Sequence, residues 1–260
     1  MTGLVIMLAT LGAPLDEVAA RFEEKTTVYT GGDYKEEKFG WRLLKPAKIE
    51  AGKKYPVILF LHGAGERGTD NKKQLLYMPE WISDPAAREK YPCFVIAPQC
   101  RPDKKWANVD WGAKESTPLP EMSDQMKVAV LALEETLKTE PCDPTRVYLT
   151  GLSMGGYGSW DLGCRHPEWF AAVVPVCGGG DDKQAAKLAD VPVWAWHGDK
   201  DGAVPVERSR KMIDAIKAAG GKPKYTELPG VGHNSWVQAY QSEGNCLPWL
   251  FEQVNTRAKK

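Results

Sequence analysis

A serine flanked by glycines is the first residue of this chain that could do covalent chemistry. Ser153 is the centre of Gly151-Leu152-Ser153-Met154-Gly155, which follows the apolar run 147–150 and precedes a helix expected over 157–164. A G-x-S-x-G sequence between strand and helix is typical of a nucleophile elbow, a strained turn that needs tiny neighbours. It predicts Ser153 as a nucleophile; the alternative is a glycine-rich turn with an inert serine.

A serine hydroxyl needs a base within hydrogen-bonding distance. The chain has four histidines. His62 precedes the serine, His166 ends the helix after it, and His197 ends an apolar strand. His233 lies in a glycine-rich loop after the last expected strand, as the order serine, acid, histidine requires. We therefore predict His233 as the general base.

The acid that orients the histidine is expected between Ser153 and His233. Two aspartates, Asp199 and Asp201, follow the apolar strand 193–196, at the carboxyl edge where open α/β sheets bind ligands. Asp201 is our choice and Asp199 the alternative. Asp181 and Asp182, after the preceding strand, are a third option.

Acyl transfer also requires donors for the oxyanion that forms on the substrate. The strand 56–61 runs into His62-Gly63-Ala64-Gly65, where one backbone N–H of such a site is expected. The other N–H belongs to the residue after the nucleophile. We predict the amides of Ala64 and Met154 as the oxyanion hole.

The elements that must position these residues alternate along the chain. Short apolar runs at 56–61, 94–98, 147–150, 171–176 and 193–196 predict buried strands, joined by strands near 26–30, 39–44 and 224–228. Helices are expected over 123–140, 207–219 and 249–254. This pattern predicts an α/β fold with a mostly parallel central sheet flanked by helices, in a single catalytic domain over 25–260 without a large lid domain.

Composition excludes several function classes. The 34 basic and 34 acidic side chains cancel, and no basic stripe occurs, so nucleic acid and anionic membranes are poor partners. The apolar run 4–15 is too short to span a bilayer. Residues 1–24 are either a secretory leader with Ala19-Ala20 as its cleavage site or a packed N-terminal extension, and we favour a secreted or periplasmic location. Six cysteines without a C-x-x-C pair predict no metal site, and no cofactor is expected.

Five ordered segments resemble the small α/β-hydrolases of the predicted peptidase and esterase family. They are 61–71 (LHGAGERGTDN), 146–162 (RVYLTGLSMGGYGSWDL), 170–181 (FAAVVPVCGGGD), 196–205 (WHGDKDGAVP) and 232–236 (GHNSW). This family is related to phospholipase/carboxylesterase, feruloyl esterase and prolyl-oligopeptidase-like catalytic domains. The resemblance implies the α/β-hydrolase fold, Asp201 as the acid and the loop at Ala64 as the oxyanion loop.

The resemblance implies a serine carboxylic ester hydrolase acting through an acyl-enzyme. Trp106 and Trp111, in the long segment 100–121, and Trp236, after the histidine, are expected to line the substrate pocket. Aromatic walls favour feruloyl or acetyl groups on polysaccharide, or another aromatic ester, as substrate. The competing functions are a serine peptidase on short peptides and a catalytically silent binding domain.

Overall fold

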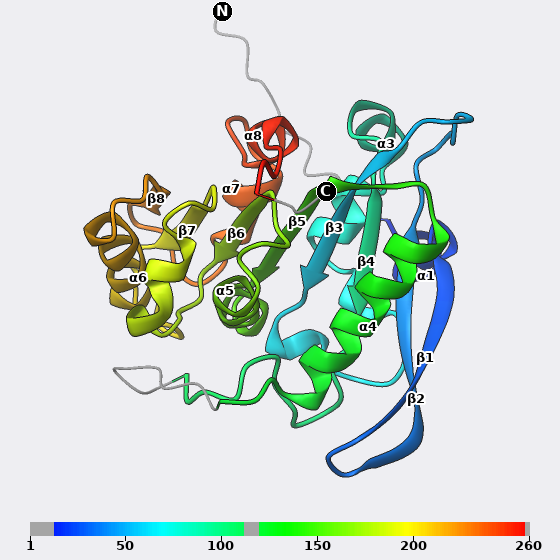
Figure 1. Ribbon diagram of the computed structural model, residues 1–260, viewed down its shortest axis with the longest axis horizontal. Coiled ribbons are helices and arrows are strands. Elements are labelled where there is room, and N and C mark those ends of the chain that lie inside the picture. Colours follow the sequence, from blue (N-terminus) through cyan, green and yellow to red (C-terminus); the bar gives the residue numbers. More distant parts are fainter. Residues whose placement is uncertain (1–12, 112–119, 258–260) are drawn as a thin grey trace, which may run out of the picture.

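A computed structural model describes residues 13–111 and 120–257 of the chain. Within these residues one eight-stranded sheet has the order β1-β2-β4-β3-β5-β6-β7-β8 (Figure 1). Strands β1 and β2 pair antiparallel, as do β2 and β4, and all other neighbours are parallel. The strands are β1 Glu23–Gly31, β2 Tyr34–Leu44, β3 Tyr55–Leu61, β4 Phe94–Pro98, β5 Cys142–Leu152, β6 Ala172–Val176, β7 Trp194–Gly198 and β8 Lys224–Leu228.

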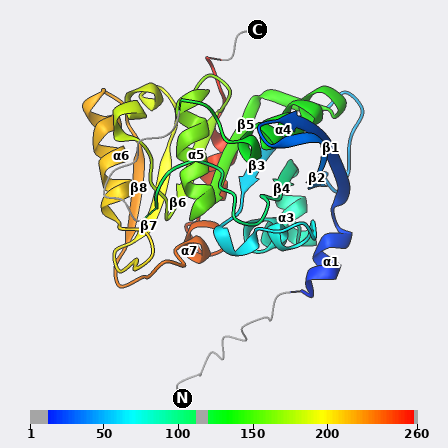
Figure 2. The same cartoon turned by 90° about the horizontal axis from the view of Figure 1, so that it is seen from below.

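Helices cover both faces of the sheet, which Figure 2 shows between two helical layers. One apolar cluster joins the sheet to α4, α5 and α6, and a second joins the opposite face to α1, α2, α7 and α8. The helices are α1 Leu15–Ala20, α2 Met78–Ile82, α3 Pro85–Lys90, α4 Asp124–Thr139, α5 Met154–Arg165, α6 Glu207–Ala218, α7 Trp236–Tyr240 and α8 Leu247–Glu252, with 3₁₀ turns η1 Ala64–Glu66, η2 Lys73–Leu75 and η3 Asp182–Leu188.

Local sequence explains the main elements. All seven residues of β3 are buried, because the strand lies in mid-sheet and both of its faces are covered. Helix α4 begins where the Ser123 hydroxyl accepts the Met126 N–H at 3.0 Å, and it ends just before Pro141. The predicted α/β-hydrolase fold is confirmed, and no insertion of the size of a lid domain interrupts the described residues.

The parallel strands bring distant segments to one edge of the sheet. The chain leaves β3 at Leu61, β5 at Leu152, β7 at Gly198 and β8 at Leu228, all at their carboxyl ends. Because parallel strands share this edge, the segments that follow them lie together. They contain every catalytic residue predicted from the sequence.

The N-terminal segment is partly described. Residues 1–12, and with them most of the apolar run considered as a leader, lie outside the described residues. Helix α1 follows, with Val18 and Ala19 buried against the sheet. In the part of the chain that the structure describes, no helix is long and apolar enough to cross a membrane.

All six cysteines lie within the described ranges, and each is buried as a free thiol. Burial is the main cause that raises their thiol pKa values, for example to about 12 at Cys93. They behave as small core residues and form no disulfide framework.

Candidate active site

Ser153 occupies a strained turn between β5 and α5. Its backbone has φ 54° and ψ −116°, a region that non-glycine residues rarely adopt. The glycines on either side are required by space, because a Cβ on Gly155 would collide with the carbonyl oxygen of Leu61, and one on Gly151 with the carbonyls of Leu61 and Gly155. The turn thus lifts the Ser153 side chain above the sheet edge, as a nucleophile elbow does.

His233 joins Ser153 to Asp201 through both of its ring nitrogens. Its Nε2 lies 2.9 Å from Ser153 Oγ, and its Nδ1 lies 2.7 Å from Asp201 Oδ2. An ionised carboxylate can only accept, so Nδ1 carries the proton and Nε2 is free to accept the serine proton. The three side chains predicted from the sequence therefore meet, although they follow three different strands.

Asp201 has hydrogen-bonding partners besides His233. Its Oδ1 accepts the N–H groups of Ala203 and Val204 at 2.8 and 2.9 Å, and its fully buried side chain also meets His197 Nε2 at 3.2 Å. Burial by itself would raise the pKa of this carboxyl. The hydrogen bonds from His197, His233 and the two amides outweigh it and hold the pKa of Asp201 far below its ordinary range.

The alternative acids have other partners. Asp199 Oδ1 accepts the N–H of Gly230 at 2.6 Å and so ties together the loops that follow β7 and β8. Asp181 accepts the N–H of Lys183 at the start of η3, and Asp182 is the first residue of that turn. Of the aspartates considered, the structure places Asp201 against His233.

His197 is a member of this network that our sequence reasoning set aside. It is buried, its Nδ1 lies 2.8 Å from Ser209 Oγ, and its Nε2 faces both Val204 O and Asp201. The order of serine, acid and histidine along the chain excluded His197 as the general base. That order does not indicate which residues hydrogen-bond to the acid. Its position four residues before Asp201, at the end of β7, was the available signal.

The two predicted oxyanion donors begin neighbouring helical turns. Ala64 is the first residue of η1 and Met154 the first of α5. Amides in the first turn of a helix have no partner within it, so both N–H groups are available to a ligand. Both residues line the cavity that contains Ser153 and His233.

His62 fixes the loop that carries Ala64. Its Nδ1 lies 2.6 Å from Gly63 O, and its Nε2 accepts the N–H of Cys100 at 2.9 Å. Since Nε2 must accept, the proton is on Nδ1. Burial lowers the pKa of His62 to about 4, so the ring is neutral near pH 7.

The cavity over the triad measures about 340 Å³. Its walls are mostly apolar, and Trp111, Trp236, Tyr77 and Tyr157 supply aromatic surface. The prediction for Trp106 does not agree with the structure, because this side chain is 1% exposed and does not line the cavity. Its indole N–H donates to His62 O at 3.0 Å, so Trp106 supports the loop that carries Ala64.

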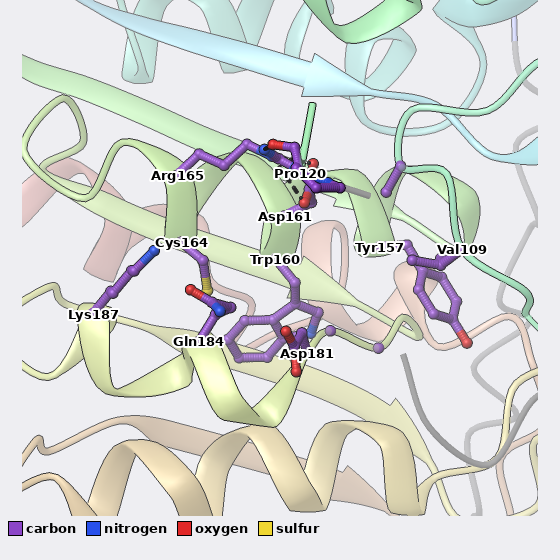
Figure 3. Close-up of a pocket in the computed structure, with 13 residues that line it drawn as sticks. Val109, Pro120, Tyr157, Trp160, Asp161, Cys164, Arg165, Asp181, Gln184 and Lys187 are labelled. Atoms are coloured by element: carbon purple, nitrogen blue, oxygen red, sulfur yellow. Dashed lines mark hydrogen bonds and ion pairs between the residues drawn. The ribbon is translucent and has the colours of Figure 1, made fainter. Parts of the chain in front are cut away.

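A second cavity, of about 230 Å³, extends along α5 (Figure 3). Trp160 and Cys164 form part of its wall, and the Asp161–Arg165 ion pair stands at one side with a contact of 2.9 Å. Tyr157 lines both this cavity and the one over Ser153. The two cavities therefore share one residue of their walls.

Among the residues that the structure describes, one group of side chains has donor atoms close enough for a metal ion: Cys177, Asp201 and His233. His233 Nδ1–H already donates to Asp201, and burial raises the pKa of the Cys177 thiol well above its usual value. A neutral thiol and a protonated nitrogen are poor ligands. We interpret the group as the hydrogen-bonded triad packed against a core cysteine.

Known esterases and a peptidase are similar to this chain in sequence or fold. A thermostable esterase of known structure is 34% identical and superposes with a TM-score of 0.82 over 92% of this chain and 64% of its own. A feruloyl esterase of Neurospora crassa is 30% identical over 119 residues, 42% of this chain and 39% of its own. An uncharacterized peptidase of Bacillus subtilis is 25% identical over 75% of this chain.

The chain spans only part of its first curated relatives, 33% of the Bacillus protein and 23% of an uncharacterized secreted protein of Arthroderma benhamiae. The profile of the phospholipase/carboxylesterase family, by contrast, matches residues 47–247, which include every residue of the site described above. The protein thus belongs to the phospholipase/carboxylesterase family of α/β-hydrolases.

Proposed function

We propose that this protein is a serine carboxylic ester hydrolase with Ser153 as nucleophile, His233 as general base and Asp201 as the orienting acid. The observation that carries the proposal is the unbroken hydrogen-bonded line from Ser153 Oγ through His233 to Asp201, at 2.9 and 2.7 Å. It combines a nucleophile, a base in the required tautomer and a buried carboxylate. Family membership makes carboxylic esters the expected substrates.

The reaction follows from the positions of these atoms. As His233 Nε2 takes the hydroxyl proton, Ser153 Oγ bonds to the ester carbonyl carbon, and the carbonyl electrons move onto its oxygen. The N–H groups of Ala64 and Met154 stabilise this oxyanion. The oxyanion then collapses, the C–O bond to the alcohol breaks, and His233 returns the proton to the departing alkoxide. Water repeats the sequence on the acyl-enzyme and releases the acid.

The aromatic walls of the cavity support a ring-bearing or sugar-linked ester as substrate. Trp111 and Trp236 stand on the cavity surface, and the ring of Trp236 lies 5.5 Å from that of His233. Planar acyl groups such as feruloyl stack well on such side chains. The resemblance to a Neurospora feruloyl esterase, although limited to 119 residues, points in the same direction.

Peptide hydrolysis is the second candidate, because a Bacillus relative is named as a peptidase. The same side chains would attack an amide, whose leaving group is poorer. A prolyl anilide cleaved faster than a matched ester would favour the peptidase.

The proposal is tested with purified protein and p-nitrophenyl acetate and butyrate. Ser153→Ala should abolish turnover and labelling by a fluorophosphonate, because the attacking oxygen is removed. Ser242→Ala is the matched control, since its hydroxyl only donates to Gln238 O, and it should keep both. Ester turnover that persists unchanged in Ser153→Ala would reject the proposal.

A further inference from the structure

Two residues that line the catalytic cavity each carry a buried polar atom without a partner among the described residues. Glu66 and Trp111 both line the cavity that holds Ser153. Within the described residues, neither Glu66 Oε2 nor Trp111 Nε1 has a hydrogen-bonding partner. Buried polar atoms are nearly always paired in folded proteins, and an exception calls for an explanation. In a catalytic cavity the simplest partner is the substrate.

Glu66 lies beside the nucleophile. It is 7% exposed and closes η1, the turn that begins with the predicted oxyanion donor Ala64. A Cβ built on Gly63 would lie 2.9 Å from Glu66 Oε2 and 3.6 Å from Ser153 Cβ. Because both atoms lie close to this one point, Glu66 Oε2 and Ser153 Cβ are close to each other.

Within the described residues, Oε2 of this carboxyl has no hydrogen-bonding partner. Hydrogen bonds from the backbone of Gly63 and of Glu66 itself lower the pKa of the carboxyl. Burial outweighs these bonds and raises the pKa of Glu66. A solvated surface glutamate would accept these bonds equally well, so they do not explain why Oε2 is buried at the site.

A hydroxyl group is a partner suited to either atom. It can donate to Glu66 when the carboxyl is ionised and accept from it when protonated, and it can also accept the Trp111 indole N–H. An ester without a hydroxyl would leave both protein groups buried and unpaired. The free-energy cost of these unpaired groups discriminates strongly between the two kinds of substrate.

We infer that Glu66 Oε2, assisted by the Trp111 N–H, selects esters with a hydroxyl close to the ester group, either on the vicinal carbon of the alcohol or on the α-carbon of the acid. Partly acylated sugars have this chemistry on the alcohol side, and 2-hydroxy acid esters have it on the acyl side. The inference rests on the proposed ester hydrolysis and assigns its specificity to two side chains. Glu66 contacts the substrate but makes or breaks no covalent bond.

The test compares substrates that differ by one hydroxyl. On the alcohol side, trans-2-hydroxycyclohexyl acetate is paired with cyclohexyl acetate; on the acyl side, cyclohexyl lactate is paired with cyclohexyl propionate. The wild type should prefer the hydroxylated member of one pair by about 10- to 100-fold in kcat/KM, the range for a hydrogen bond that involves an ionisable group. The pair that shows the preference identifies the side of the ester.

Variants separate recognition from loop support. Glu66→Leu should bring the preference to near one, Glu66→Gln should retain most of it because the amide still donates and accepts, and Trp111→Phe should lower it severalfold. Glu243→Leu, at an exposed position, is the matched control and should keep the full preference. A variant that only disturbs the turn η1 would slow the hydrolysis of both members of a pair equally. The measured quantity is therefore the ratio of the two kcat/KM values.

Equal kcat/KM values within both pairs, or a preference that survives Glu66→Leu, would overturn the inference. Ester hydrolysis that depends on Ser153 would persist in that case and leave the proposed function standing. Hydrolysis that is absent, or unaffected by Ser153→Ala, would instead remove the proposed function.

Discussion

Acidification should weaken the native fold through His62, between pH 6.5 and about 4. The neutral ring donates from Nδ1 to Gly63 O and accepts the Cys100 N–H at Nε2. Protonation would place a second donor against that N–H inside the core. The folded protein therefore resists protonation until about pH 4, whereas the unfolded chain takes up the proton near the ordinary value of 6.5.

The sign and size follow from proton linkage. Within this window the unfolded state binds more protons, so the free energy of unfolding falls as the pH falls, by up to about 1.4 kcal/mol per pH unit for one group. Across the whole window His62 should contribute roughly 3 kcal/mol, present in full above pH 6.5 and lost by pH 4. That is a large share of the stability of a typical domain.

The assay is urea unfolding at half-unit steps from pH 4 to 7.5. His62→Gln removes the titration but keeps a donor and an acceptor, so its free energy of unfolding should depend less steeply on pH than that of the wild type. His166→Gln, which changes a partly exposed histidine, is the control and should follow the wild type. A His62→Gln profile parallel to the wild-type profile would refute the reasoning, whatever the offset between them.

Two further paired substitutions test the site. Asp201→Asn should lower kcat for p-nitrophenyl acetate by about 10⁴-fold, because an amide favours the wrong tautomer of the histidine. Asp199→Asn changes only a loop contact with Gly230, so its effect should stay below about tenfold; the opposite ranking would exchange their roles. Gly155→Ala should prevent folding to soluble protein, whereas Gly202→Ala, where a Cβ meets nothing within 4 Å, should leave the melting temperature unchanged. A soluble, active Gly155→Ala protein would contradict the tight packing of the elbow.

The central sheet was predictable because its strands are continuous apolar runs. β4 and β8 have the predicted bounds, and β3 begins one residue earlier. β5 is longer than its apolar run because its polar start still pairs with the start of the parallel strand β3, through Cys142 and Tyr55. Helix α5 starts at Met154, three residues before the prediction, because the elbow turns directly into the helix. The short helices α2 and α3 have too few residues to show a period.

The site was predictable where chain order or motif restricts the choice, as for Ser153 and His233. It was not predictable where only packing decides. Trp106 and Trp111 share one segment and one residue type, yet the first is buried behind the loop that carries Ala64 and the second lines the cavity. Glu66 lies in the segment 61–71 that resembles the family, but its position in the sequence does not indicate that its side chain is buried.

The buried cysteines make the native protein inert toward thiol reagents. A maleimide or an aromatic disulfide can modify a sulfhydryl only after the surrounding core has opened, because all six are shielded. The rate at which each thiol is modified thus measures how often the region around it opens. These regions range from Cys93 beside the sheet to Cys246 at the start of α8. The native cysteines thus report local unfolding, and no further cysteine has to be introduced by mutation.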